Sequence, residues 1–244
     1  MVATNFFAGK QVIFSPTKHC LQAVEMFVES ITTILNQRRD AVLVITDNDS
    51  EPEIKVFLKK LNHPQIIVEF SDQNIGKARA TNEYIAKYFD RNALPATVWS
   101  MDPDILLDAA SFNYLVEAIQ NMPDNVRVLG PRYVKNECNP EMNVRFPAKK
   151  IKGKNGKIYS VVFPFLACVA GPILVMTGQT MRDLFNFRFF PTDKYLPYGN
   201  DDTAIYLALR KKHLKSGYLN GATGNHLKSD NKRVLEFRQW TKKI

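Results

Sequence analysis

The chain has few cysteines and no long apolar run, and each shortage excludes a class of protein. Only Cys20, Cys138 and Cys168 occur among the 244 residues. Their wide spacing fits neither a disulfide framework nor a zinc site, so we expect a reducing, cytoplasmic setting. No apolar stretch approaches the roughly 20 residues that cross a bilayer, so we expect no integral membrane contact. The first residues also lack a basic segment followed by an apolar one, which argues against a secretory signal.

Charge is distributed unevenly along the chain. Residues 1–129 contain 12 Lys and Arg against 16 Asp and Glu, whereas residues 130–244 contain 21 against 8. A basic C-terminal half indicates a polyanionic partner such as nucleic acid, or an anionic membrane surface. A basic face kept for solubility would have the same composition, so charge alone leaves both explanations open. The overall composition is that of a globular protein, without repeats or linkers.

The first half alternates short apolar runs with segments of helical periodicity. Apolar strands that alternate with helices indicate a mixed, mostly parallel sheet with helices on both faces, which is an α/β fold. The expected strands are residues 11–16, 41–47, 65–70 and 96–102, and the expected helices are residues 21–37, 51–62, 75–92 and 110–121.

The pattern changes after Leu129. Residues 130–159 have few periodic apolar positions and a Lys/Gly-rich turn at residues 154–156, which predicts an inserted loop or a small antiparallel unit. Buried strands are expected again in residues 161–178, interrupted at Gly171 and Pro172. Residues 202–216 are expected to form a helix, and residues 224–230 a polar, glycine-rich loop.

Polar residues follow each expected strand of the first half, and ligands of open parallel sheets bind at the carboxyl ends of the strands. These polar stretches are residues 15–17, 47–49, 71–76 and 100–104. In the last of them, Asp102 and Asp104 are separated by Pro103. This spacing lets two carboxylates face one hard cation, such as Mn²⁺ or Mg²⁺, that also binds phosphate oxygens. A strand-ending turn produces the same spacing, so the pair alone is weak evidence.

Three further segments contain charged or metal-binding side chains that would complete such a site. One helix begins after an Asn-Ile-Gly turn and has two basic side chains in its first turn that could contact phosphate. Another helix begins with two acidic residues. A histidine further on could be an additional metal ligand. Each also has an ordinary explanation, as a solvated helix face, a helix cap or an exposed loop histidine. Their order along the chain favours a functional site. The residues are Asn74, Gly76, Lys77, Arg79, Asp201, Asp202 and His226.

Together these segments resemble the family 2-like glycosyltransferases of the GT-A fold. "FSPTKH" and "VLVITDNDS" look like their opening strand–helix–strand, and "NIGKARATN" is similar to their segment beneath the diphosphate. "SMDPD" matches their Asp-X-Asp metal motif, and "YGNDDTAIYLAL" resembles the segment with the catalytic base. The resemblance runs from Gln11 to His226. It departs from the family at Asn200, where a Glu usually precedes the base, and residues 130–159 match no part of the pattern.

The resemblance implies a single GT-A-like domain over residues 1–244, with a nucleotide-sugar half (1–129) and a basic acceptor half (130–244). It implies a metal-dependent, inverting hexosyl- or pentosyltransferase that uses a nucleoside-diphosphate sugar, first of all a UDP-sugar. Mn²⁺ or Mg²⁺ would bind Asp102, Asp104 and His226. The catalytic base would be Asp201, with Asp202 as the alternative. The nucleotide-sugar contacts would be Ser15, Pro16, Thr17, Asp47, Asn74, Gly76, Lys77, Arg79 and Asp102.

The basic second half, with Phe237 and Trp240 in its tail, favours DNA as the acceptor. A phage enzyme that glycosylates hydroxymethylated pyrimidines, in the host cytoplasm, would have this character. Alternatives are a glycosyltransferase for a lipid-linked or surface glycan, a sugar-nucleotide nucleotidyltransferase, and a non-catalytic nucleic-acid-binding protein. The oligomeric state is not predicted. The candidate acceptor contacts are Lys149, Lys150, Lys152, Lys154, Arg210 and Lys211.

Overall fold

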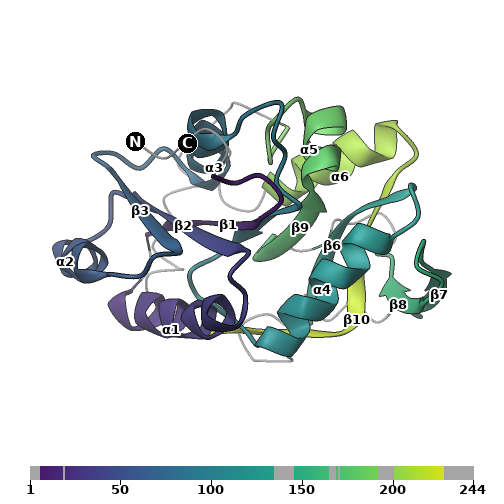
Figure 1. The fold of residues 1–244 in the computed structure, drawn as a ribbon, viewed down its shortest axis with the longest axis horizontal. Helices are drawn as coiled ribbons and strands as arrows, with labels where there is room; N and C mark the ends of the chain where they lie inside the picture. Colours follow the sequence, from purple (N-terminus) through teal and green to yellow (C-terminus); the bar gives the residue numbers. More distant parts are fainter. Residues whose placement is uncertain are drawn as a thin grey trace, which may run out of the picture.

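The computed structural model describes residues 6–18, 20–134, 146–164, 169, 171–191 and 201–227. Within these ranges ten strands form one sheet in the order β3-β2-β1-β4-β9-β6-β10-β8-β7, and β5 pairs with β10 (Figure 1). The strands are β1 (Gln11–Thr17), β2 (Ala41–Asn48), β3 (Ile66–Ser71), β4 (Thr97–Met101), β5 (Ile105–Leu107), β6 (Val126–Tyr133), β7 (Lys149–Lys152), β8 (Ile158–Val162), β9 (Ile173–Thr177) and β10 (Lys215–His226). The helices are α1 (Leu21–Gln37), α2 (Pro52–Lys60), α3 (Lys77–Tyr88), α4 (Ala109–Asn121), α5 (Gly178–Phe185) and α6 (Asp201–Lys211).

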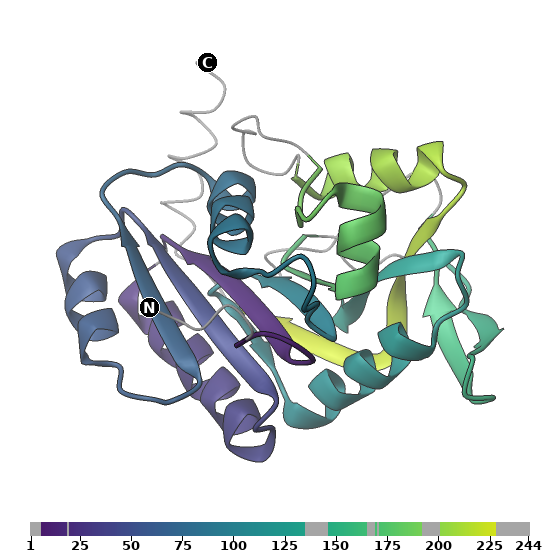
Figure 2. The same cartoon turned by 45° about the horizontal axis from the view of Figure 1, so that its top comes forward.

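Helices cover both faces of the sheet. Helices α1, α2 and α4 lie on one face, and α3, α5 and α6 lie on the other (Figures 1 and 2). The neighbouring strands β3, β2, β1 and β4 are all parallel, so their carboxyl ends meet at one edge of the sheet. This arrangement confirms the predicted α/β fold class with a mixed sheet. No helix among the described residues combines the length and the apolar character that a bilayer crossing requires.

The first half folds as its periodicity predicts. Every residue of β1 and β2 is buried, because helices cover both faces of these central strands, and this accounts for their nearly continuous apolar sequence. Helix α1 buries one stripe against the sheet, with Val24, Phe27, Ile31 and Ile34 fully inaccessible, as its helical spacing requires.

Beyond β4 the sheet is mixed, and β6 and β10 pair in parallel. Strand β9 runs antiparallel to both β4 and β6. Of the two alternatives predicted for residues 130–159, a loop or a small antiparallel unit, β7 and β8 form the second. The prediction that the regular pattern ends at Leu129 was wrong, because Gly130–Tyr133 complete β6. At Gly130 an added Cβ would lie 2.8 Å from the carbonyl oxygen of Ile173. Glycine therefore serves close strand packing there and does not mark a loop.

The sequence did not predict β5, β6, α5 or β10, and β10 is the most consequential omission. Its sequence, KSGYLNGATGNH, is poor in strand-forming residues, yet it pairs with β6, β8 and β5. At Gly217 a Cβ would lie 2.5 Å from Val161 Cγ1, so tertiary packing demands a residue that intrinsic propensity disfavours. The expected helix over residues 202–216 ends at Lys211. His226 ends β10 and does not lie in the expected loop.

Side chains anchor the β7–β8 hairpin to α4. Glu117 pairs with Lys157 Nζ at 2.6 Å and accepts a hydrogen bond from Tyr159 Oη at 3.1 Å. Lys154 Nζ pairs with Asp124 at 2.7 Å, and its backbone N–H donates to the carbonyl of Asn121 at 2.7 Å. The hairpin is therefore held against the body of the protein, and β7 forms one outer edge of the sheet.

Candidate active site

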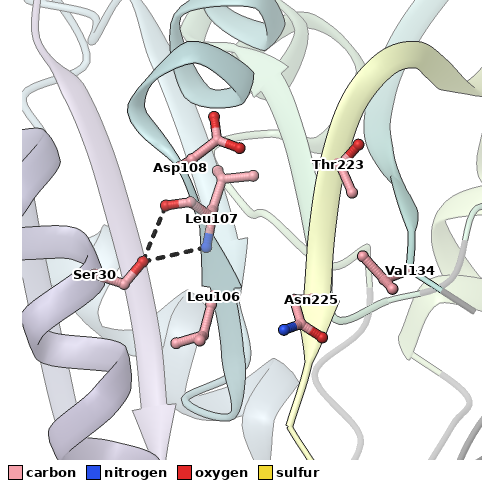
Figure 3. A pocket seen from close by; sticks show the side chains of 7 residues that line it. All are labelled: Ser30, Leu106, Leu107, Asp108, Val134, Thr223 and Asn225. Carbon is pink, nitrogen blue, oxygen red and sulfur yellow. Dashed lines mark hydrogen bonds between the residues drawn. The ribbon is translucent and has the colours of Figure 1, made fainter. Parts of the chain in front are cut away.

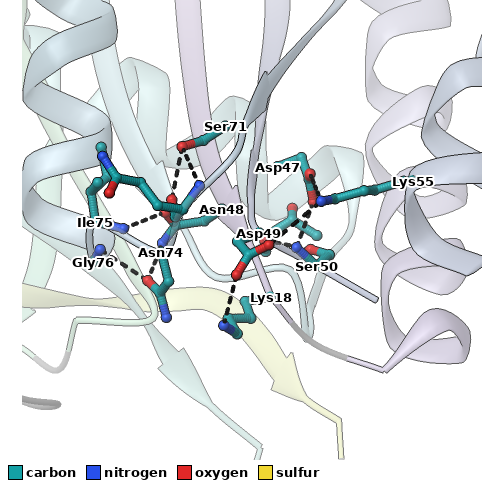
Figure 4. A network of polar contacts seen from close by, with 12 residues as sticks. Lys18, Asp47, Asn48, Asp49, Ser50, Lys55, Ser71, Asn74, Ile75 and Gly76 are labelled. Carbon is teal, nitrogen blue, oxygen red and sulfur yellow. Dashed lines mark hydrogen bonds and ion pairs between the residues drawn. The ribbon is translucent and has the colours of Figure 1, made fainter. Parts of the chain in front are cut away.

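The carboxyl end of β2 contains a buried acid beside two lysines. Asp47 is fully buried, and its Oδ1 accepts a hydrogen bond from the Ser50 N–H at 3.1 Å. Lys55 Nζ lies 3.9 Å from Asp47 Oδ2 and 3.5 Å from Asp49, and Asp49 also pairs with Lys18 at 3.8 Å (Figure 4). Lys55 is not among the site residues predicted from the sequence. Its place in the helix directly after the β2 acid is the only sequence signal for it.

Two asparagines shape the loop that leads into α3. Asn48 Nδ2 donates to Asn74 Oδ1 at 2.8 Å, and Asn48 Oδ1 accepts from the Ile75 N–H at 2.9 Å. Asn74 Oδ1 also accepts from the Gly76 N–H at 3.0 Å (Figure 4). Gly76 has φ 80° and ψ 157°, a conformation that residues with a Cβ rarely adopt. The loop is thus fixed, with the first N–H groups of α3 beside it.

The end of β1 is enclosed. Ser15, Pro16 and Thr17 are its last residues and are all buried. The carbonyl of Thr17 already accepts a hydrogen bond from Ser50 Oγ at 2.8 Å. The predicted contacts of this segment with base and ribose remain a prediction.

Lys77, the first residue of α3, joins three parts of the chain. Its Nζ lies 2.6 Å from Asp102 Oδ1 and 3.6 Å from Asp201 Oδ2, and it donates to the carbonyl of Gly171 at 2.7 Å. The ring centroid of Phe190 is 5.8 Å away. The side chains of Lys77, Asp102 and Asp201 are 21%, 25% and 15% exposed. The structure therefore brings three predicted site residues into one partly buried ion cluster.

Burial and mutual repulsion perturb the acids of this cluster. Burial raises the pKa of Asp102, and although Lys77 opposes the rise, Asp104 and Asp201 add to it. Burial also raises the pKa of Asp202, with a further contribution from Asp201. For Lys77, burial lowers the pKa, but the attraction of Asp102 and Asp201 outweighs it and the pKa is raised. Acids that crowd together in this way favour a cation between them.

The turn from Asp102 to Asp104 is held from two sides. The Asp102 N–H donates to the carbonyl of Pro172 at 2.8 Å, and the carbonyl of Asp104 accepts from the Leu227 N–H at 2.7 Å. The Asp104 side chain is buried, and its Oδ2 lies 3.1 Å from His226 Nε2. Burial lowers the pKa of His226, but the hydrogen bond and charge of Asp104 outweigh it, so the pKa is raised. The structure thus brings Asp104 and His226 into contact.

The two acids at the start of α6 have different surroundings. Asp202 Oδ2 accepts a hydrogen bond from the Gly171 N–H at 3.1 Å, and its Oδ1 accepts from the Thr203 N–H at 2.7 Å. Asp201 is instead oriented toward Lys77. Asn200, which precedes both acids, lies outside the described residues.

Asn82, within α3, fixes the segment beyond α5. Its Oδ1 accepts from the N–H groups of Phe189 and Phe190 at 2.9 and 3.1 Å, and its Nδ2 donates to the carbonyl of Phe190 at 2.8 Å. The residue is buried. Helix α3 therefore supports the ion cluster through Lys77 at its start and the Phe189–Phe190 segment through Asn82.

Other predicted residues lie apart from this cluster. Arg79 pairs with Glu83 at 2.7 Å on the exposed side of α3. Lys149, Lys150 and Lys152 are exposed on β7, while Lys154 is the hairpin residue that pairs with Asp124. Arg210 and Lys211 lie in the last turn of α6. The aromatic residues of the tail, Phe237 and Trp240, fall outside the described part of the chain.

A cavity of about 310 Å³ lies behind this site and is distinct from it. It opens between α1 and β10 next to β5 (Figure 3). Asn225 lines it, whereas the adjacent His226 contacts Asp104. Because successive residues of a strand point to opposite faces, the β5–β10 pair separates the cavity from the acid cluster. Its lining residues are Ser30, Leu106, Leu107, Asp108, Val134, Thr223 and Asn225.

The acid cluster has the donor chemistry that Mn²⁺ or Mg²⁺ prefers, since carboxylate oxygens dominate it. However, no group of three or more His, Cys, Asp or Glu side chains in the described ranges is arranged to hold a metal on its own. The residues fit a divalent cation whose coordination is completed by a ligand.

Comparisons with known proteins agree with this fold. The chain has the fold of a mannosyltransferase from Pyrobaculum calidifontis solved with GDP-Man and Mn²⁺ (16% identity, TM-score 0.61, 89% of this chain and 56% of that one). It is also similar to GalNAc-T7 solved with UDP, GalNAc and Mn²⁺ (12%, 0.61, 91% and 44%) and to TarS of S. aureus (11%, 0.61, 90% and 37%).

The chain thus spans about half the length of these proteins or less. No curated protein matches its sequence. The sequence profile described as "Glycosyl transferase family 2" matches residues 13–173, from β1 to the start of β9. Because this match covers more than half of the chain, the protein belongs to glycosyl transferase family 2.

Proposed function

We propose that the protein transfers a sugar from a nucleoside-diphosphate donor, first of all a UDP-sugar, to an acceptor hydroxyl with inversion at the anomeric carbon. The observation that carries this proposal is the ion cluster of Lys77, Asp102 and Asp201. It joins the candidate diphosphate site to the candidate base at the carboxyl edge of the sheet. Family membership supports the reaction class.

The donor would lie along the ends of β2 and β4. Asp47, beside Lys55, would hydrogen-bond a base or ribose only after the segment following β2 moves, because the side chain is fully buried. The Asn74–Gly76 loop would present the N–H groups that begin α3 to the diphosphate. Helix N-termini favour anions because their first N–H groups are unpaired within the helix. Lys77 would then contribute a positive charge toward the same phosphates.

Asp102 and Asp104, with His226 beside Asp104, would hold Mn²⁺ or Mg²⁺. When bound, such a cation stabilises the negative charge that develops on the leaving diphosphate. The mannosyltransferase and GalNAc-T7 structures contain Mn²⁺, which supports a divalent cation here. Asp102 would also orient the donor, since it lies between Lys77 and the rest of the turn.

Asp201 would take the proton from the attacking hydroxyl. A general base needs a carboxylate within hydrogen-bond reach of the nucleophile. Asp202 is the weaker candidate, because both of its oxygens already accept backbone hydrogen bonds. Inversion follows if the hydroxyl attacks directly while Asp201 accepts its proton, so that the sugar forms a bond to the acceptor as its bond to the diphosphate breaks.

For the acceptor we favour a hydroxymethylated pyrimidine in DNA. Lys149, Lys150 and Lys152 form no ion pair with any residue that the structure describes, and they lie on an edge strand anchored to α4. Such a basic ridge suits the phosphate backbone of a duplex, and the target base would have to leave the stack. Arg210 and Lys211 would extend the basic surface, whereas Lys154 is neutralised by Asp124. A phage enzyme of this kind would act in the host cytoplasm.

The same ridge would suit a lipid-linked or surface glycan at an anionic membrane, which is the second candidate acceptor. Lysines on an edge strand also prevent unwanted strand pairing, so their presence does not by itself require DNA.

One experiment tests donor and acceptor together. The protein is incubated with Mn²⁺, a panel of UDP- and GDP-sugars, and either duplex DNA with hydroxymethylcytosine, unmodified DNA or a lipid-linked glycan. Digested nucleosides and extracted lipids are then analysed by mass. A hexose or pentose added to hydroxymethylcytosine supports the full proposal. Transfer to the glycan alone would reject the DNA acceptor, and no transfer or donor hydrolysis with any sugar nucleotide would reject the activity.

A further inference from the structure

We propose that Lys77 is an internal counter-ion that keeps a divalent metal off Asp102 until a nucleoside diphosphate binds. This inference rests on the proposed function and concerns the order in which that site is filled. Lys77 is a positioning residue in this role, because it acts through Asp102.

The position of Lys77 is the first support. Its Nζ lies 2.6 Å from Asp102 Oδ1, and the carbonyl of Gly171 and the carboxylate of Asp201 provide its other two contacts. Two N–H bonds of the ammonium therefore have an acceptor within hydrogen-bond distance, and the charge of Asp201 lies 3.6 Å away. A lysine in this state gains nothing from leaving Asp102 unless another anion replaces these contacts.

The second support is the state of the Asp-X-Asp pair as a whole. Asp102 is engaged by Lys77, and Asp104 by His226. No arrangement of three protein ligands for a metal exists within the described ranges. A divalent cation that enters alone would meet one carboxylate already paired with an ammonium, and it would then lie next to that like charge.

A diphosphate removes both obstacles. It supplies oxygen ligands for the cation, and it offers Lys77 a new anionic partner at the start of α3, next to Gly76. Lysine is suited to this exchange because its ammonium is a compact charge on a flexible four-carbon stem. Metal and diphosphate should therefore bind cooperatively, and each should raise the affinity for the other by the same factor.

A different role would have a different signature. If Lys77 only contacts phosphate, its removal weakens diphosphate binding and leaves the affinity for free Mn²⁺ unchanged. If it excludes metal from Asp102, its removal strengthens the binding of Mn²⁺ in the absence of any nucleotide. The affinity for Mn²⁺ alone thus separates the two roles and needs no measurement of activity.

The test compares wild type with Lys77→Met, Lys77→Gln and Lys87→Met, using Mn²⁺ titrations followed by electron paramagnetic resonance. Gln lacks the charge but retains a hydrogen-bond donor toward Asp102, so Lys77→Gln should remain folded even if Lys77→Met does not. Melting curves check that each variant is folded. Lys87 is the matched control, because it is also an ion-paired lysine of α3, with Glu69 at 2.8 Å, but it lies on the exposed surface.

We expect both Lys77 variants to bind free Mn²⁺ about 5- to 150-fold more tightly than wild type, the usual range of coupling between sites. Lys87→Met should match wild type. Adding UDP should raise the Mn²⁺ affinity of wild type much more than that of Lys77→Gln. Unchanged binding of free Mn²⁺ in the folded Lys77 variants would overturn the inference. A wild-type protein that binds neither UDP nor GDP at saturating Mn²⁺ would instead overturn the proposed function.

Discussion

At the scale of single residues, hydrogen bonding distinguishes two neighbouring acids that the sequence cannot separate. Both oxygens of Asp202 accept backbone N–H groups, so this carboxylate joins the start of α6 to Gly171. Among the described residues, Asp201 forms an ion pair only with Lys77. As the proposed base, Asp201 would have to release Lys77 and accept a proton during the reaction.

Asn substitution of the two acids should therefore give different results. We expect Asp201→Asn to lower the single-turnover rate of transfer by about 10²- to 10⁴-fold with little change in donor affinity. Asp202→Asn should mainly lower the melting temperature, because its amide replaces an acceptor of backbone hydrogen bonds. Rates from rapid quench and donor affinities from calorimetry check both variants. Equal losses of rate in the two would contradict the assignment of Asp201 as base.

Removal of Asp104 tests the metal assignment. Asp104→Ala should reduce Mn²⁺-dependent donor hydrolysis and transfer by at least about 10²-fold, the effect of losing one group that stabilises developing charge. Donor hydrolysis measured across a series of Mn²⁺ concentrations provides the readout. Full activity at the Mn²⁺ concentration that saturates wild type would reject Asp104 as a ligand.

At the scale of elements, α3 connects the two ends of the site. Lys77 begins the helix, and Asn82, on its buried side, holds the Phe189–Phe190 backbone through three hydrogen bonds. The sequence places Asn82 in a recognisable segment, but nothing in that segment indicates which distant backbone it holds.

Loss of the Asn82 amide should destabilise the protein. Asn82→Ala leaves two buried N–H groups and one carbonyl without their partner, so we expect the free energy of unfolding to fall by about 1–3 kcal/mol. Asn82→Asp keeps the acceptor for both N–H groups and should lose less. Urea denaturation measures both variants. An Asp variant less stable than the Ala variant would show that the donated bond to Phe190 dominates.

The limits of prediction from sequence also follow from individual elements. Strands β1 and β2 and helix α1 were predictable because burial on both faces, or on one stripe, imposes a clear apolar pattern. Strand β10 was not, because the closeness of Val161 demands glycine at position 217 and the strand has few strand-forming residues. The sequence could identify Asp104 and His226 as candidates. It could not show that they touch, because His226 belongs to the unpredicted strand β10. The Lys77–Asp102 contact was equally hidden, since the residues belong to different elements.

At the scale of the whole molecule, charge is segregated. The acidic first half contains the candidate metal site, and the basic second half exposes β7 at one edge of the sheet. Of the lysines on the hairpin, Lys154 and Lys157 are neutralised by Asp124 and Glu117. The part of the hairpin available to a polyanion is therefore smaller than the sequence suggests.

Charge reversal on β7 tests the acceptor surface. The double variant Lys150→Glu/Lys152→Glu should weaken binding to duplex DNA. It should also reduce the salt dependence of that binding, by roughly 0.9 in the logarithmic slope for each DNA phosphate that the variant no longer neutralises. Fluorescence anisotropy at several salt concentrations measures both quantities. Lys59→Glu/Lys60→Glu on α2, two exposed lysines at the far end of the sheet, is the matched control. Equal effects of the two pairs would indicate only a general influence of net charge.

The two-sided attachment of the Asp102–Asp104 turn has a consequence for how the enzyme is made. Pro172 holds one side of the turn and Leu227 the other, so residues about 70 and 120 positions downstream complete it. During synthesis, the parallel strands β1 to β4 can pair long before these partners leave the ribosome. Contacts of such long sequence separation form slowly. The Asp102–Asp104 turn therefore gains both of its backbone attachments only after nearly the whole described chain has been synthesised.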